Sequence, residues 1–203
     1  MVVRLGVLGG TFDPIHDVHL VLAEEVRKRL RLSEVVFIPA GHPWLKLDHP
    51  VTAVEHRVEM VRRAIEGRPY FRLSTIEIER PGPTYTVDTL AELRSQLDEQ
   101  DEIYFILGCD SLTELPPWHE PSRIIQLCRL VAAPRPGHVP DLNALERAIP
   151  GISKRVTILD KPVVDVSSSD IRRRVAGGLP INDLVPPAVV RYIQAHGLYS
   201  GQK

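Results

Sequence analysis

The sequence predicts an α/β fold in which a mainly parallel β-sheet is covered by helices on both faces. Short apolar, β-rich runs alternate along the chain with segments of helical periodicity, and this alternation is typical of parallel sheets. With 203 residues, of which 43% are hydrophobic, the chain can bury a substantial core as one domain. We therefore expect a single domain over residues 1–203, in which residues from about 166 to 203 form a C-terminal helical part.

Six apolar runs of the sequence are predicted strands. They are Val3–Leu8, Val35–Pro39, Phe71–Ile78, Ile103–Gly108, Leu130–Ala133 and Val156–Leu159. Seven segments with helical periodicity are predicted helices. They are His16–Leu30, Thr52–Glu66, Thr86–Leu97, Pro121–Cys128, Asp141–Ile149, Ser168–Val175 and Pro187–His196.

Local signals mark some of the helix ends and the edge of the sheet where a ligand would bind. The run Thr52-Ala53-Val54-Glu55 has the form of a capping box, and Gly67 and Gly197 stand where helices are expected to stop. In sheets of this kind, ligands bind beyond the carboxyl ends of the strands, at the point where the strand order reverses. The loops after the first, second, fourth and fifth strands are therefore the expected place of a binding site.

Charge and composition exclude several classes of function. The net charge of −1 argues against broad attachment to nucleic acid, and no run approaches the roughly 20 apolar residues of a membrane span. The N-terminus begins a strand and lacks the pattern of a signal peptide. Cys109 and Cys128 have no spacing pattern, so we expect free thiols in a reducing compartment. These observations predict a cytoplasmic protein without nucleic-acid or membrane partners; they do not predict its oligomeric state.

A first candidate phosphate-binding segment follows the first strand. Residues 9–19 read Gly-Gly-Thr-Phe-Asp-Pro-Ile-His-Asp-Val-His, so Gly9 and Gly10 form a turn and His16 and His19 share the first turn of a helix. Glycines let the backbone approach a ligand, and the free N–H groups of a helix start favour an anion. Gly-Gly alone is most often an ordinary turn, and His-x-x-His without a third ligand is a weak indication of metal. The whole string predicts phosphate binding.

A second candidate lies near the C-terminus, in the run Ser-Ser-Ser-Asp-Ile-Arg-Arg-Arg over residues 167–174. Serine hydroxyls and free helix-start N–H groups suit phosphate oxygens, and Arg172 would present its planar guanidinium one turn further on. The alternative is a well-capped surface helix whose basic residues are solvated, and Arg173 and Arg174 fit that interpretation.

Together these segments resemble a known family. Gly9–His19 resembles the Gly-x-Thr-Phe-Asp-Pro-x-His-x-Gly-His signature of the nucleotidyltransferase superfamily, and Ser167–Arg172 resembles its Ser-[Ser/Thr]-Thr-x-x-Arg partner. Further segments are similar to bacterial nicotinate mononucleotide adenylyltransferases, so the resemblance extends over nearly the whole chain. They are Pro83–Leu90, Gly108–Leu112, Trp118, Arg135–Gly137 and the ending from Leu184 to Tyr199. The resemblance implies a Rossmann-like, doubly wound fold whose C-terminal helices complete an ATP site.

The implied reaction joins ATP and nicotinate mononucleotide to give nicotinate adenine dinucleotide and pyrophosphate in NAD biosynthesis. The attacking phosphate monoester has a second pKa of about 6 and is largely ionised at neutral pH, so no general base is needed. A direct in-line attack without a covalent intermediate is expected, and Mg²⁺ should arrive with ATP. Cys109 is then a small buried filler and not a nucleophile.

The resemblance implies roles for residues at the ATP site. His16 is expected to contact the reacting phosphates and His19 the ATP phosphates, while Arg172 and the helix start at Ser168 and Ser169 would hold the β- and γ-phosphates. The remaining residues expected to bind ATP follow the first and fourth strands: Gly9, Gly10, Thr11, Phe12, Gly108 and Asp110. Asp110 would accept hydrogen bonds from ribose hydroxyls, or act as a helix N-cap, or both.

For the acceptor nucleotide, Thr86 would open a helix whose N-terminus favours a carboxylate over a neutral amide. Trp118 offers a flat face to the pyridine ring, or packs as an ordinary core aromatic. The backbone N–H of His119 could reach the same carboxylate, and Arg135 is expected at the sugar or phosphate on resemblance alone. Lys46 either bridges the phosphates of both substrates, as a fourth catalytic residue beside His16, His19 and Arg172, or is a surface lysine.

Val18 departs from the family pattern, which has glycine at this position, and we expect it to affect the fit around ATP. Two alternative functions remain at this point. One is another transferase of the superfamily, with nicotinamide mononucleotide, phosphopantetheine or glycerol phosphate as acceptor; Tyr85, Thr86 and Trp118 argue against the last two. The other is a nucleotide-binding sensor without catalysis, which only Val18 favours.

Overall fold

The sheet of the computed structural model has six strands in the order β3-β2-β1-β4-β5-β6, and every neighbouring pair is parallel. The strands are β1 (Arg4–Gly10), β2 (Glu34–Pro39), β3 (Phe71–Leu73), β4 (Glu102–Gly108), β5 (Arg129–Ala133) and β6 (Val156–Ile158). The structure describes residues 2–41, 51–161 and 165–201. Because the strand order reverses between β1 and β4, the sheet is doubly wound, as predicted.

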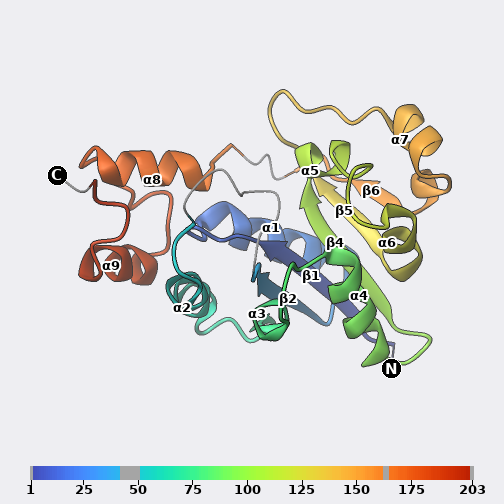
Figure 1. The fold of residues 1–203 in the computed structure, drawn as a ribbon, viewed down its shortest axis with the longest axis horizontal. Helices are drawn as coiled ribbons and strands as arrows, with labels where there is room; N and C mark the ends of the chain where they lie inside the picture. Colours follow the sequence, from blue (N-terminus) through green and yellow to red (C-terminus); the bar gives the residue numbers. More distant parts are fainter. Residues whose placement is uncertain (1, 42–50, 162–164, 202–203) are drawn as a thin grey trace.

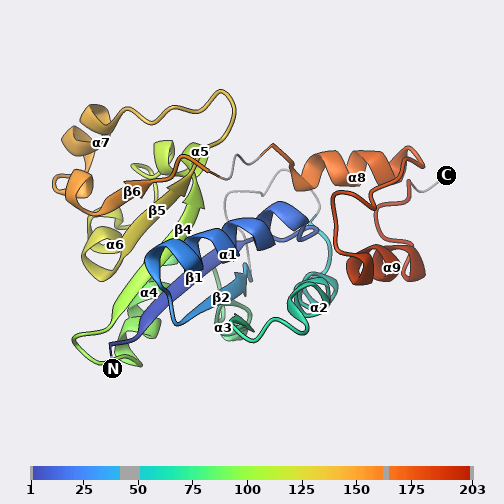
Figure 2. The same cartoon turned by 180° about the vertical axis from the view of Figure 1, so that it is seen from behind.

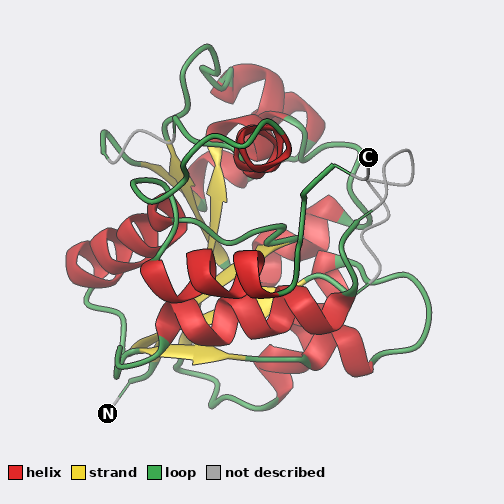
Figure 3. Ribbon diagram, turned by 90° about the vertical axis from the view of Figure 1, so that its left-hand side faces the viewer, coloured by secondary structure: helices red, strands yellow, loops and turns green. Residues whose placement is uncertain are grey.

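Helices lie on both faces of this sheet. They are α1 (Asp17–Leu30), α2 (Val54–Ile65), α3 (Ile76–Glu79), α4 (Thr86–Ser95), α5 (Cys109–Thr113), α6 (Pro121–Leu127), α7 (Leu142–Ala148), α8 (Ser168–Ala176) and α9 (Pro187–Ala195), with a 3₁₀ turn, η2, at Ile152–Lys154. Figure 1 shows α4 in front of the sheet, and the reverse view in Figure 2 shows α1 across the opposite face. In the side view of Figure 3 the strands run between helical layers. Among the described residues, no helix has the length and apolar character that crossing a membrane requires.

Alternation along the strands divides the core into two halves. On β4, Tyr104 and Ile106 contribute to one buried cluster, while Ile103, Phe105 and Leu107 contribute to the other. Successive side chains of a strand point to opposite faces, so a strand that is apolar throughout needs cover on both sides. Helices α1, α2 and α9 supply the first half of the core, and α4, α6 and α7 supply the second.

Two local predictions were wrong. The predicted strand Phe71–Ile78 ends at Leu73, and Ile76–Glu79 forms α3 instead. β3 pairs over three residues with β2 alone, so little of the ladder holds this segment extended. The predicted capping box at Thr52 is also absent, because the N-cap of α2 is Ala53 and makes no side-chain cap bond. The Thr52 N–H donates instead to the Asp13 carboxylate, at 3.2 Å.

The C-terminal helices α8 and α9 lie beyond one end of the sheet, with α9 close to α2 (Figure 1). Val189 and Ile193 of α9 are buried in the same cluster as Ile15, which precedes α1. The backbone N–H of Asp17, the first residue of α1, donates to the carbonyl of Leu184 at 3.0 Å. The C-terminal part therefore packs directly against the start of α1, where the first candidate phosphate-binding segment lies.

Candidate active site

The two histidines of the first segment stack on each other at the start of α1. His16 is the N-cap and His19 the third helical residue, and their ring centroids are 3.7 Å apart. The backbone N–H of His16 donates to Nδ1 of His19 at 3.2 Å. Phe12 is buried, and its ring packs edge-on against His19 at 5.1 Å. Its aromatic side chain therefore supports His19 from the core, which leaves the Phe12 backbone for any contact with ATP.

Burial controls the charge of His16. The side chain is 3% exposed, and its buried Nδ1 has no hydrogen-bond partner among the residues that the structure describes. Burial and, to a smaller extent, the nearby positive charge of Arg135 together lower the pKa of His16 from its ordinary 6.5 to about 4. At neutral pH this imidazole is uncharged, so it offers a ligand a hydrogen bond and not a positive charge.

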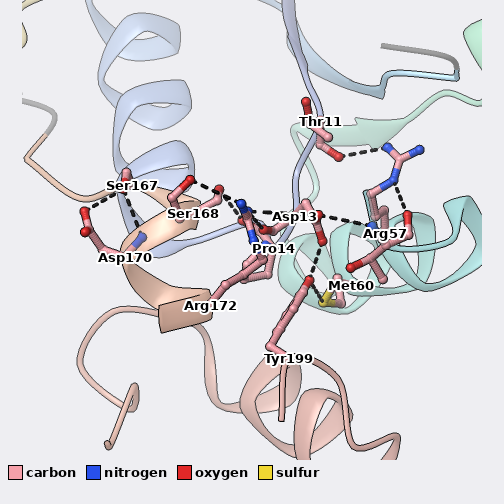
Figure 4. Close-up of polar contacts among 12 residues, drawn as sticks. Thr11, Asp13, Pro14, Arg57, Met60, Ser167, Ser168, Asp170, Arg172 and Tyr199 are labelled. Carbon is pink, nitrogen blue, oxygen red and sulfur yellow. Dashed lines mark hydrogen bonds and ion pairs between the residues drawn. The ribbon is translucent and has the colours of Figure 1, made fainter. Parts of the chain in front are cut away.

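The second segment meets the first one, although they are more than 150 positions apart. Ser168 Oγ donates to the carbonyl of Pro14 at 2.9 Å, and Arg172 Nη1 donates to the carbonyl of Asp13 at 2.7 Å (Figure 4). A second Arg172 nitrogen, Nη2, donates to Ser169 Oγ at 3.2 Å. The interpretation as a solvated basic surface therefore fails for Arg172. It holds for the flanking side chains of Arg173 and Arg174, which are exposed.

Gly108, Asp110 and Arg135 form a third part of the site, where β4 and β5 end side by side. Arg135 Nη1 lies 2.7 Å from Asp110 Oδ2, an ion pair that the sequence did not indicate. A Cβ at position 108 would lie 2.2 Å from Asp110 Oδ1, so glycine leaves room for this carboxylate. The expected N-cap role of Asp110 is wrong: the N-cap of α5 is Gly108, and Asp110 is the second helical residue.

A cavity of about 280 Å³ opens between the ends of β1 and β2 and the start of α4. Its lining residues are Val7, Gly9, Gly10, Thr11, Ile38, Ala40, Glu77, Thr84, Thr86, Thr89, Leu90, Phe105, Ser111 and Trp118. Thr86 is the first residue of α4, as expected, so the N-terminus of that helix meets the cavity. Trp118 packs edge-on against Phe105, and within the described part of the chain its buried Nε1 has no hydrogen-bond partner. An indole N–H at a cavity wall is a ready donor for a ligand.

Two of the residues expected to bind substrate do not line this cavity. The exposed His119 stacks its ring on Tyr85 at 4.4 Å and lies 3.8 Å from the Glu120 carboxylate. Arg135 is held at Asp110, as described above. The prediction for Lys46 falls on residues 42–50, outside the described part of the chain. Val18 is half-buried in the first turn of α1 and does not line the cavity.

The sequence did not indicate three further polar residues around the site: Arg57 and Asp13, which are buried, and Tyr199, which is partly buried. Arg57, 2% exposed, donates to the carbonyls of Thr11 at 2.9 Å and Thr52 at 3.0 Å. Asp13, 3% exposed, accepts a hydrogen bond from the hydroxyl of Tyr199 at 2.6 Å. Asp13 lies inside the recognised motif, so its position there was an available signal. Arg57 looks like any other arginine of an amphipathic helix, and no sequence signal distinguishes it.

Glu77 is a fourth missed residue, because the segment was expected to be a strand. Its carboxylate lines the cavity and accepts a hydrogen bond from Thr89 Oγ1 at 2.9 Å. Burial raises the pKa of Glu77, and the hydrogen bond from Thr89 opposes that shift. The cavity therefore contains a carboxyl group whose charged form is disfavoured, next to the helix start at Thr86.

The thiols have no part in this arrangement. Both cysteines are free and buried, as expected, and burial raises the pKa of Cys128 to about 12 and that of Cys109 in the same direction. A thiol with a raised pKa is a poor nucleophile at neutral pH. Within residues 2–41, 51–161 and 165–201, no group of three or more His, Cys, Asp or Glu side chains could hold a metal ion.

The fold and the two converging segments define a nucleotide-binding α/β protein, and comparison with known proteins agrees with this class. The family model described as cytidylyltransferase-like matches residues 7–174. A relative from Dehalococcoides mccartyi, named "Probable nicotinate-nucleotide adenylyltransferase", is 53% identical over 200 residues, covering 98% of each chain. A relative of the same name from Thermomicrobium roseum is 46% identical over 97% of this chain and 91% of its own length.

A solved structure has the same fold. The nicotinic acid mononucleotide adenylyltransferase of Plasmodium falciparum, complexed with NaAD, superposes with a TM-score of 0.81 over 98% of each chain, at 21% sequence identity. On the identity and coverage of its relatives, the chain belongs to the nicotinate-nucleotide adenylyltransferase family.

Proposed function

We propose that this chain transfers the adenylyl group of ATP to nicotinate mononucleotide, releasing pyrophosphate and forming nicotinate adenine dinucleotide in the biosynthesis of NAD. One observation carries the proposal. Ser168 and Arg172 contact the backbone of Pro14 and Asp13, two and three residues before His16. Donors from both ends of the chain are thereby gathered next to the cavity that Gly9, Gly10 and Thr11 line.

The chemistry asks the protein to bring two anions together and to stabilise a third. A phosphate oxygen of nicotinate mononucleotide attacks the α-phosphorus of ATP, and the bond from that phosphorus to pyrophosphate breaks. Because the attacking phosphate is largely ionised above about pH 6, no side chain needs to remove a proton. His16, uncharged, donates a hydrogen bond to the reacting phosphates, and Arg172 supplies positive charge for the leaving pyrophosphate. His19, Ser168 and Ser169 add further donors to the triphosphate.

Mg²⁺ enters with ATP, as part of the substrate. The groups at the proposed phosphate site are imidazoles, hydroxyls, a guanidinium and backbone N–H groups, which suit phosphate oxygens better than a cation. This donor set fits an ion that keeps several waters and is bound through phosphate. When bound, Mg²⁺ would neutralise the part of the triphosphate charge that Arg172 does not offset.

The acceptor nucleotide occupies the cavity at the start of α4. The Thr86 helix start favours the carboxylate of the pyridine ring, and Trp118 offers its indole face and its buried N–H. His119 does not line this cavity, so the expected contact between its backbone N–H and this carboxylate is not part of the proposal. Arg135 and Asp110, which are paired where β5 and β4 end, serve the sugars and the acceptor phosphate.

The test is pyrophosphate release from MgATP with a panel of acceptors. Nicotinate mononucleotide is expected to be used much faster than the amide, phosphopantetheine or glycerol phosphate. Equal or faster turnover of the amide would contradict the preference for the acid. ATP binding without turnover of any acceptor would favour a sensor instead.

A further inference from the structure

Asp13 and Tyr199 lie next to the ATP site proposed above but have no role in the chemistry described so far. Both are brought there by packing that joins the end of the chain to the loop after β1. The Asp13 carboxylate is buried and the Tyr199 side chain is partly buried.

The two oxygens of the Asp13 carboxylate have different partners. Oδ1 accepts from the Tyr199 hydroxyl at 2.6 Å, and Oδ2 accepts from the Thr52 N–H at 3.2 Å. Burial and the nearby Asp13 carboxylate both raise the pKa of Tyr199, so the phenol stays protonated and acts as the donor. A carboxylate that is 3% exposed and held at both oxygens has one available orientation.

Arg172 contacts Asp13 at two atoms. Its Nη1 donates to the Asp13 carbonyl at 2.7 Å and lies 4.0 Å from Oδ2 of the same residue, with Ser169 as its third contact. Figure 4 shows the Tyr199 hydroxyl and the Arg172 guanidinium meeting Asp13 from different directions. Asp13 therefore offers Arg172 two groups. Its backbone carbonyl accepts a hydrogen bond, and its carboxylate supplies an opposite charge.

We propose that Tyr199 and Asp13 are positioning residues of the ATP site: Tyr199 orients the Asp13 carboxylate, and Asp13 holds the Arg172 guanidinium ready for the triphosphate. An arginine on a long side chain loses conformational freedom when it binds a phosphate, and holding it in advance lowers that cost. The C-terminal segment after α9 thereby contributes to ATP affinity without touching ATP. This inference rests on the proposed function of Arg172.

The test replaces Tyr199 by Phe in the full-length chain, which removes the hydroxyl and keeps the ring. We expect KM for ATP to rise about 10-fold, the scale for one lost hydrogen bond to a charged group, with KM for nicotinate mononucleotide and kcat within about twofold. Tyr192→Phe is the matched control. Tyr192 is a buried tyrosine whose hydroxyl lies 2.9 Å from Nδ1 of His56, a side chain that is not part of the proposed ATP site, so both KM values should stay at wild type.

A double-mutant cycle distinguishes positioning from a general loss of structure. In an Arg172→Ala background, Tyr199→Phe should cause no further rise in KM for ATP, because the group it positions is gone. An unchanged KM for ATP in Tyr199→Phe would overturn the proposal. So would an equal effect in the Arg172→Ala background, or an equal effect of Tyr192→Phe.

Two further measurements keep the test decisive. If Tyr199→Phe does not fold, Asp13→Asn takes its place, because it keeps the shape of the side chain. It should raise KM for ATP by a similar factor, and an unchanged KM for ATP would contradict the proposal. If the wild-type chain turns over no acceptor, the proposed function fails. Calorimetric titration of the same variants with MgATP then tests the positioning role by itself, with the same expected ratios.

Discussion

At the scale of single residues, the His-x-x-His pair contains two imidazoles with different surroundings. His16 is buried and has a pKa of about 4, whereas His19 is partly exposed. The contribution of His16 to the free energy of unfolding depends on pH for this reason. In the unfolded chain its pKa returns to about 6.5, so the unfolded state binds more protons than the folded state at acid pH.

The unfolding free energy should therefore fall as the pH is lowered through 6.5, by about 1.4 kcal/mol per pH unit down to pH 4 from His16 alone. Between pH 7 and pH 5 this amounts to about 2 kcal/mol. Urea unfolding at both pH values should show this component in the wild type and lose it in His16→Gln. The exposed His138 gives the control, since His138→Gln should keep the wild-type dependence. The same slope in His16→Gln would contradict the assignment.

Gly108 is a residue whose lack of a side chain has a specific reason. Because a Cβ there would lie 2.2 Å from Asp110 Oδ1, Gly108→Ala should displace the carboxylate and separate it from Arg135. We expect kcat/KM to fall by about 10- to 100-fold, the scale for small displacements at a reacting site. Gly201→Ala, where no atom of the other described residues lies within 4 Å of the added Cβ, should leave the value unchanged. Wild-type kinetics in Gly108→Ala would refute this account.

At the scale of elements, α2 is joined to the loop after β1 through the buried guanidinium of Arg57. Arg57 donates to the carbonyl of Thr11 after β1 and to the carbonyl of Thr52 just before α2, and it lies 3.4 Å from the carbonyl of Gly41 after β2. Burial lowers the pKa of Arg57, and the Asp13 carboxylate opposes the shift. All three acceptors are backbone carbonyls, so Arg57 helps to fix the backbone position of Thr11, Gly41 and Thr52.

Arg57→Met keeps most of the side-chain volume but leaves these carbonyls without a donor. We expect the free energy of unfolding to fall by about 3 kcal/mol, as when one partner of a buried polar network is removed. Arg62→Met on the exposed side of the same helix removes a surface ion pair with Glu59 and should cost less than about 1 kcal/mol. Chemical denaturation of both variants measures the difference; equal costs would argue against a special role for Arg57.

The accuracy with which sequence patterns predict the bounds of helices and strands differs between elements. Helices and strands with strong periodicity, such as α1 and β4, lie within a residue or two of their predicted bounds. The segment after Phe71 was misjudged because short apolar runs are compatible with either structure, and only the pairing partner decides. Thr52 was misjudged because Asp13, 39 positions away, competes for its backbone N–H.

At the scale of the whole molecule, the C-terminal helices share the core of the sheet. Ile193 of α9 is 1% exposed and lies in the cluster that contains residues of α1, α2 and β4. The cluster is continuous, so the C-terminal part should unfold together with the sheet.

Ile193→Ala should lower the global unfolding free energy by about 3 kcal/mol, with coincident transitions by tryptophan fluorescence and far-UV circular dichroism. Leu179→Ala changes a residue of the C-terminal part that is 56% exposed and should cost less than about 1 kcal/mol. A separate early transition in the Ile193 variant would mean that the C-terminal part unfolds independently, and the single-domain prediction would be wrong.

The class of fold and the two segments proposed to bind phosphate can be predicted from the amino-acid sequence alone. The periodicity of strands and helices is a local property of the sequence. Gly9–His19 and Ser167–Arg172 are short runs whose residue types indicate their chemistry without knowledge of the tertiary structure. Only the tertiary structure decided that Arg172 rests on Asp13, that Asp110 pairs with Arg135, and that Arg57 and Tyr199 belong to the site. Each of these contacts joins residues from different elements, and their burial and hydrogen bonds exist only once the sheet has brought those elements together.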